Sequence, residues 1–130
     1  MAAELAIVIV GMNTRDWLRG CLLSLRAHAE IALEIVVVDN CSEDGSCEMI
    51  EREFPEVQLV RNTQLYGFAQ NNNIGAAQTS APLLLFLNPD TEVPAGSLRA
   101  MLDIIAREVG CGIFGGKLFD ADGEVERSVG

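Results

Sequence analysis

Short apolar runs alternate with amphipathic stretches along the whole chain, and this alternation limits the fold more than any other feature of the sequence. The apolar runs lie at 5–10, 34–39, 57–61 and 82–87. Continuous apolar strands are typical of parallel sheets that are covered on both faces. The pattern therefore predicts repeated strand and helix units in an α/β fold, with a mostly parallel sheet and helices on both of its faces.

The apolar residues between and after these strands recur at helical spacing. This spacing predicts four helices, at 14–28, 45–53, 66–79 and about 98–109, with Asn13 as the cap of the first. The inward face of the first helix is expected to carry Trp17, Leu18, Cys21, Leu22 and Leu25. Small residues are expected to let the third helix approach the sheet closely, and they are Ala69, Asn73, Ala76 and Ala77. A last strand is expected near 112–119.

Composition restricts the classes of function. The 130 residues are 49% hydrophobic and 22% charged, which is typical of a soluble globular domain. A formal net charge of -10 repels a phosphate backbone, and no run of Lys or Arg offers a basic stripe, so we expect no nucleic-acid partner. No apolar stretch approaches the length of a membrane span. We therefore predict a single cytoplasmic domain over residues 1–130.

The residues directly after each strand are the candidates for a binding site, because ligands bind beyond the carboxyl ends of the strands in open parallel sheets. In this sequence they are Gly11 to Asn13, Asp39, and Asn88 to Asp90. Taken singly, each has an alternative explanation as turn chemistry, because Asn and Asp side chains hydrogen-bond to nearby backbone groups. Thr91 or Glu92 could also make the contribution expected of Asp90.

Four ordered blocks of the sequence resemble family 2 glycosyltransferases, especially the bacterial rhamnosyltransferase-like branch. They read AIVIVGMNTRDWLRGCLLSL, EIVVVDNCSEDGS, VQLVRNTQLYGFAQNNNIGAA and LLLFLNPDTEVPAGSL, and they cover nearly the whole chain. The resemblance implies a Rossmann-like GT-A fold that binds a nucleoside-diphosphate sugar with a divalent metal, Mg²⁺ or Mn²⁺. It also implies that Asp90 is the metal ligand, because the segment NPD stands where the family has its D-x-D motif.

The same resemblance assigns the nucleotide-binding residues. Asp39 is expected to accept a hydrogen bond from the base or ribose, which suits uracil or thymine, and Asn88 is expected to reach ribose or metal. Met12, Asn13 and Asn72 complete the set. Two of these positions depart from the family, since many relatives have an aromatic residue at Met12 and an Arg at Asn72. Neutralisation of the donor pyrophosphate then depends more on the metal.

No residue of this chain matches the carboxylate that serves relatives as general base, so no catalytic residue is assigned. The resemblance implies the truncated donor-binding half of an inverting enzyme, whose acceptor is a glycan or a lipid-linked glycan and whose full-length form works at the inner face of the membrane. The alternative is a catalytically incompetent fragment that only binds nucleotide or forms a homo-oligomer through exposed apolar surface. A nucleotidyltransferase or dinucleotide-dependent reductase is disfavoured, because no glycine-rich phosphate loop follows the first strand.

Overall fold

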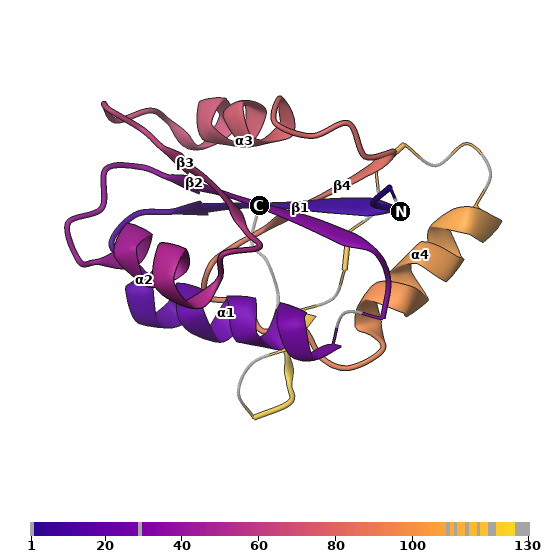
Figure 1. Ribbon diagram of the computed structural model, residues 1–130. Helices are drawn as coiled ribbons and strands as arrows, with labels where there is room; N and C mark the ends of the chain where they lie inside the picture. The colour runs from indigo at the N-terminus through magenta and orange to yellow at the C-terminus, as the bar shows by residue number, and fades with distance from the viewer. Residues whose placement is uncertain are drawn as a thin grey trace. The chain divides into compact units, whose positions relative to one another are not determined.

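A four-stranded sheet, in which all neighbouring strands are parallel, organises residues 1–98 (Figure 1). Its strands are β1 (Leu5–Gly11), β2 (Leu33–Asp39), β3 (Gln58–Arg61) and β4 (Leu83–Leu87), in the order β3-β2-β1-β4. The four predicted strands are confirmed to within one residue at either end. The α/β class with a parallel sheet is confirmed as well.

The computed structural model describes residues 2–28, 30–108, 110, 112–113, 115–116, 118–119 and 122–126. These residues fall into two units, 1–98 and 99–130. The helices are α1 (Arg15–His28), α2 (Ser46–Glu53), α3 (Phe68–Ala76) and α4 (Ser97–Arg107). Helices α1 and α2 cover one face of the sheet and α3 covers the other (Figure 1), which confirms the expected two-sided cover. No helix among the described residues is long and apolar enough to cross a bilayer.

The main core lies between the sheet and helices α1 and α2. Alternate residues of β1 and β2 point into it, and they are Leu5, Ile7, Ile9 and Val37. Apolar side chains of α1 and α2, and of the residue directly after α2, complete this core: Leu18, Cys21, Leu22, Leu25, Met49, Ile50 and Phe54. The inward face predicted for α1 is correct except for Trp17, which is 67% exposed. Trp17 lies in the first turn of α1, next to the fully buried Leu18.

The opposite face of the sheet is covered closely by α3, and Gly75 makes this approach possible. A Cβ atom at Gly75 would lie 2.3 Å from Cγ1 of Val8 and 3.2 Å from Cγ2 of Val38. The residues of α3 that are buried are Asn71 and Gly75, while Asn73 is exposed. The predicted packing face of α3 is therefore wrong, because the small residues were assigned to the wrong side of a helix with few apolar residues to set its phase.

Gly75→Ala is expected to lower the free energy of unfolding by about 1 to 3 kcal/mol, because the new methyl group overlaps a stiff β-branched side chain. Gly20→Ala in α1 is the matched control, since a Cβ there would meet only the Glu92 carboxylate, at 3.5 Å. Ala at position 20 is expected to raise the free energy of unfolding by up to about 1 kcal/mol through helix propensity. Urea unfolding measures both variants, and changes of the same sign would contradict the packing explanation.

The second unit, residues 99–130, contains most of α4 and a short antiparallel pair of strands. In this pair β5 (Leu118–Phe119) lies beside β6 (Val125–Glu126), with Leu118 opposite Glu126. The strand expected near 112–119 is thus confirmed at its last two residues, and 112–113 and 115–116 are not in a strand. Residues 111, 114 and 117 lie outside the described part of the chain.

Candidate functional site

The carboxyl ends of the parallel strands lie at one edge of the sheet, which we call the carboxyl edge (Figure 1). Register places Gly11 opposite Asp39 and Asp39 opposite Arg61. The loops that leave β1 and β2 are therefore immediate neighbours, while the loop with Asn88 leaves β4, on the other side of β1. All the residues proposed from the sequence for a binding site, except Asn72 of α3, lie in these loops or at the strand ends.

Asp39 is buried, with 3% of its surface exposed. Its Oδ2 accepts a hydrogen bond from Ser42 N at 2.9 Å, as in an ordinary turn, but its Oδ1 is buried without a hydrogen-bond partner of standard geometry. The Cys47 thiol of α2 lies beside this carboxylate: burial raises the pKa of Cys47 to about 12, and hydrogen bonding to Asp39 and its charge add to the rise. A thiol is a weak donor, so Oδ1 is left available for a stronger one.

Hydrogen bonds that we call the loop clasp tie the loop after β1 to the loop after β2. Asn13 N donates to Ser42 Oγ at 2.9 Å, and Asn13 Oδ1 accepts from Glu43 N at 2.8 Å. Arg15 N donates to Asp44 Oδ2 at 2.8 Å. The prediction that Asn13 caps α1 is therefore wrong, because its side-chain oxygen bonds across the loops and its backbone is left-handed, with φ at 51°. Of the Asn13 side chain, only the nitrogen Nδ2 is left for a ligand.

Asp44 is the charged member of the loop clasp. Burial raises the pKa of Asp44, but hydrogen bonds from the Ser46 hydroxyl and from the backbone N–H groups of Arg15 and Ser46 outweigh it and hold the pKa below the usual 3.8. A lowered folded-state pKa stabilises the fold above the unfolded value, and this contribution is lost only as the pH falls through the lower one. The loop clasp is therefore complete at neutral pH.

Two arginines lie near the carboxyl edge, and both are engaged with acidic or carbonyl groups. Arg15 contacts Asp16 at 3.1 Å and donates to Asp44 O at 3.2 Å. Arg61 pairs with Glu48 at 3.3 Å and with Glu51 at 3.1 Å. Neither guanidinium is a free positive charge for a phosphate.

The side chains of Met12 and Asn72, unlike those of the loop clasp, are not held by hydrogen bonds to the described residues. Met12 is 48% exposed after β1, which leaves its thioether open to a ligand ring. Asn72 is half-buried and is the fifth residue of α3, and its amide makes no hydrogen bond with the described residues. Its neighbour Asn71 is 1% exposed and accepts a hydrogen bond from Asn62 at 2.7 Å. Sequence reasoning missed Asn71, although its spacing of four residues from Gly75 marks one helix face.

Asn88 and Asp90 lie in an exposed turn after β4, where Thr91 N donates to Asn88 O at 3.1 Å. Val93 N donates to Ser24 Oγ at 3.0 Å, which anchors the end of this loop to α1. Burial raises the pKa of Cys21 in α1 to about 12, and the charges of Asp90 and Glu92 add to the rise. The Asp90 carboxylate itself makes no hydrogen bond or ion pair with the described residues. Among the described residues, nothing therefore competes with a cation for this carboxylate.

A metal would find few protein ligands at this edge. Within the described ranges, no three or more His, Cys, Asp or Glu side chains gather into a group that could hold a metal ion. Mg²⁺ commonly keeps several waters and is held by one or two carboxylates together with substrate phosphates, and Mn²⁺ accepts similar oxygen ligands. A single free carboxylate at Asp90 thus fits a metal that binds together with a pyrophosphate, and does not form a complete protein cage.

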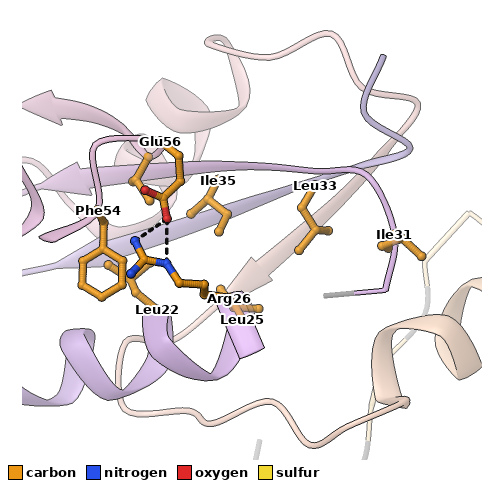
Figure 2. A pocket seen from close by; sticks show the side chains of 9 residues that line it. Leu22, Leu25, Arg26, Ile31, Leu33, Ile35, Phe54 and Glu56 are labelled. Atoms are coloured by element: carbon orange, nitrogen blue, oxygen red, sulfur yellow. Dashed lines mark hydrogen bonds and ion pairs between the residues drawn. The ribbon is translucent and has the colours of Figure 1, made fainter. Parts of the chain in front are cut away.

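A pocket of about 250 Å³ lies away from the carboxyl edge, between the end of α1 and the start of β2 (Figure 2). Arg26 forms part of its wall, paired with Glu56 at 2.6 Å and lying 4.4 Å from the centroid of the Phe54 ring. The rest of its lining is apolar, formed by Leu22, Leu25, Ile31, Leu33, Ile35 and Val57. None of the residues proposed from the sequence lines this pocket, so it is not part of the candidate site.

Comparison with known sequences gives a family. The chain matches the profile of Glycosyl transferase family 2 over residues 6–127. It is 29% identical to the N-acetylglucosaminyl-diphospho-decaprenol L-rhamnosyltransferase of Mycobacterium tuberculosis over 136 residues, which covers 96% of this chain and 44% of that protein. The chain spans 14 to 44% of the length of the curated relatives that it matches.

Solved structures show the same fold. TarS 1-349 of S. aureus in complex with UDP-GlcNAc superposes with a TM-score of 0.73 at 18% identity, over 86% of this chain and 37% of that one. The mannosyltransferase PcManGT of Pyrobaculum calidifontis in complex with GDP-Man and Mn²⁺ also gives 0.73, at 21% identity, over 82% of this chain and 33% of that one. These likenesses confirm the fold that the resemblance implied. With its profile match over nearly every residue, the chain belongs to Glycosyl transferase family 2.

Proposed function

We propose that this chain is the donor-binding half of an inverting glycosyltransferase that holds a UDP or dTDP sugar through a divalent metal. The observation that carries the proposal is a pair of carboxylates at the carboxyl edge that the described residues leave incompletely bonded: only the weak thiol donor of Cys47 lies beside Asp39 Oδ1, and Asp90 makes no hydrogen bond or ion pair with them. Asp39 Oδ1 is buried, and the Asp90 carboxylate is exposed. A buried acceptor suits a ring N–H or a ribose hydroxyl, and an exposed free carboxylate suits a hydrated cation.

The charge balance of the site supports the metal. The chain has a formal net charge of -10, and Arg15 and Arg61 are both already paired, so the described part of the carboxyl edge offers little positive charge for a pyrophosphate. Asp90 would hold a divalent cation, whose charge would offset that of the pyrophosphate. When bound, the cation supplies Lewis-acid stabilisation of the nucleoside diphosphate that leaves as the sugar is transferred.

The chain's own residues bind and orient the nucleotide. The loop clasp holds the loops after β1 and β2 at a fixed separation, with Met12 exposed to contact a face of the base. Asn88, Asn72 and the free amide nitrogen of Asn13 are donors for ribose and phosphate oxygens. Complexes of structural neighbours with UDP-GlcNAc and with GDP-Man and Mn²⁺ support this kind of donor.

The acceptor side of the reaction requires an acceptor-binding site and a general base, and we assign neither to a residue of this chain. We propose that the acceptor is a glycan or a lipid-linked glycan, in line with the decaprenol-linked substrate named for the mycobacterial relative. A lipid-linked acceptor would bring the full-length enzyme to the inner face of the membrane. The general base that takes the proton from the acceptor hydroxyl would then belong to a further part of the enzyme.

A second candidate function is nucleotide binding or self-association without transfer. It is favoured by the β4 strand, which is an edge of the four-stranded sheet and has Leu84 and Phe86 exposed at 43% and 49%. Exposed apolar strands at a sheet edge are common sites of association between chains. Formation of a glycosylated product from a UDP or dTDP sugar and a lipid-linked acceptor analogue supports transfer, and nucleotide binding without product supports the second candidate.

Titration calorimetry of the chain with UDP and with dTDP tests the donor proposal. We expect heat of binding in the presence of Mn²⁺ and little or none after the metal is removed with EDTA, because the pyrophosphate then meets an uncompensated acidic edge. CaCl₂ in place of MnCl₂ controls for ionic strength and for a less suitable cation. Equal affinity with and without metal would contradict the metal-mediated part of the proposal, and no binding of either nucleotide would contradict the whole of it.

A further inference from the structure

Three asparagines from three different elements meet beside the carboxyl edge. Asn40 directly follows β2, Asn62 directly follows β3, and Asn71 lies on the sheet-facing side of α3. Asn40 is 9% exposed and Asn71 is 1% exposed, which is unusual for an amide side chain unless its groups are satisfied. We call these residues the asparagine triad.

The asparagine triad is bonded around the backbone of Tyr66. Asn40 Oδ1 accepts from Tyr66 N at 3.0 Å, and Asn40 Nδ2 donates to Tyr66 O at 3.1 Å, so Asn40 pairs with Tyr66 as a neighbouring strand would. Asn71 Nδ2 donates to the same carbonyl oxygen at 3.1 Å. Asn62 Nδ2 joins the other two side chains, donating to Asn71 Oδ1 at 2.7 Å and to Asn40 Oδ1 at 3.2 Å.

The segment held in this way connects β3 to α3. Its residues Thr63, Gln64 and Leu65 are exposed, so apolar packing does not fix them. Helix α3 then begins after Gly67, with no side-chain cap and no acidic residue in its first turn. Asn40 of the triad is the residue next to Asp39. The backbone carbonyl of Asp39 accepts a hydrogen bond from Asn62 N at 2.9 Å. Hydrogen bonds therefore run without a break from the backbone of Asp39, through Asn62 and Asn71, to the start of α3.

We infer that the asparagine triad positions the Tyr66 turn and the start of α3 relative to Asp39, and thereby sets the affinity of the site for a nucleoside diphosphate. The inference rests on the proposed function. A buried polar network is a costly way to gain stability alone, because apolar side chains of similar size fill such a space equally well. Its particular effect is to fix one arrangement of three segments, each of which reaches the carboxyl edge.

Asn71→Asp is the sharpest probe because it changes no volume. The ionised carboxylate can still accept from Asn62, but it loses the donor to Tyr66 O and sets an anionic oxygen against that carbonyl. We expect UDP to bind about tenfold more weakly than to the unsubstituted chain at pH 8 with Mn²⁺, as for the loss of one well-placed hydrogen bond. Burial and the neighbouring Tyr66 carbonyl favour the protonated form of a carboxyl at this position, so at pH 5 it regains an O–H donor and the difference should shrink to about threefold or less.

Dissociation constants are measured by calorimetry for both proteins at each pH, and their ratio is compared. The nucleotide phosphates titrate at about pH 6 and change both dissociation constants alike, so this effect cancels in the ratio. Val57→Ala is the control for stability, since Val57 is buried, lines the pocket and makes none of the hydrogen bonds of the triad. Thermal unfolding establishes that each variant is folded under the binding conditions.

If Asn71→Asp does not fold, Asn62→Ala replaces it, because Asn62 is only half-buried and its loss leaves both remaining partners without their shared donor. An affinity loss of about tenfold is again expected. Unchanged affinity in a folded triad variant, a ratio that does not move with pH, or an equal loss in Val57→Ala would overturn the inference alone. Failure of the unsubstituted chain to bind UDP would overturn the proposed function, and this inference with it.

Discussion

Replacing Asp90 with Ala is expected to abolish the metal-dependent part of nucleotide binding, weakening the affinity for UDP in the presence of Mn²⁺ by about a hundredfold. The physical reason is that Asp90 has an exposed carboxylate that none of the described residues bonds, while the edge arginines are already paired. Calorimetry with and without Mn²⁺ measures the effect on the nucleotide. Electron paramagnetic resonance of Mn²⁺ measures the metal directly, as loss of the nucleotide-dependent bound signal.

Glu92→Ala is the matched control for Asp90→Ala. Glu92 is a second exposed carboxylate of the same loop, and its charge raises the pKa of Cys21 as that of Asp90 does, although burial of the thiol contributes most. Both substitutions therefore remove one negative charge from the same neighbourhood. We expect Glu92→Ala to change the affinity by about threefold or less. A large loss in Glu92→Ala with little change in Asp90→Ala would assign the metal to Glu92 and contradict the motif-based assignment.

The sheet was predictable from the sequence because its strands are covered on both faces. Runs such as Leu5 to Val10 carry no polar residue that would confuse the pattern, and they become β1 with little adjustment. Helix α3 was harder, because it owes its position to the absence of a side chain at Gly75 and to a buried amide at Asn71. Neither residue is apolar, so the sequence predicted that a helix forms here but not which face of α3 packs against the sheet.

The position of the candidate residues at the ends of the strands was predictable, but the hydrogen bonds among them were not. The rule that ligands bind beyond strand ends singled out Asp39 and Asp90 as candidates, and the structure places both at the carboxyl edge. The role of Asn13 was missed because its partner Glu43 lies 30 residues away, and only the fold brings the two loops together. Asn62 lies 22 residues from Asn40 for the same reason. Taken singly, such asparagines are indistinguishable from turn residues.

Replacing Asp39 with Asn is expected to weaken UDP binding by about thirtyfold while the chain stays folded. The side chains have the same shape, and the Ser42 backbone N–H can still donate to the remaining oxygen of the amide. What is lost is the charged, buried acceptor at Oδ1, which has only the weak thiol donor of Cys47 beside it and suits the N3–H of uracil. The measurement is calorimetry with UDP and Mn²⁺, with thermal unfolding to confirm the fold.

Base selectivity makes the Asp39 prediction specific. Cytosine presents an acceptor at N3 where uracil presents a donor, so a carboxylate should favour UDP over CDP and an amide N–H should reduce that preference. We expect the ratio of the CDP to the UDP dissociation constant to fall from about tenfold or more toward one in Asp39→Asn. Glu43→Gln, an exposed position in the same loop, loses the same charge and should leave this ratio unchanged. If both variants weaken UDP and CDP equally, Asp39 acts through the general electrostatic field of the loop and does not contact the base.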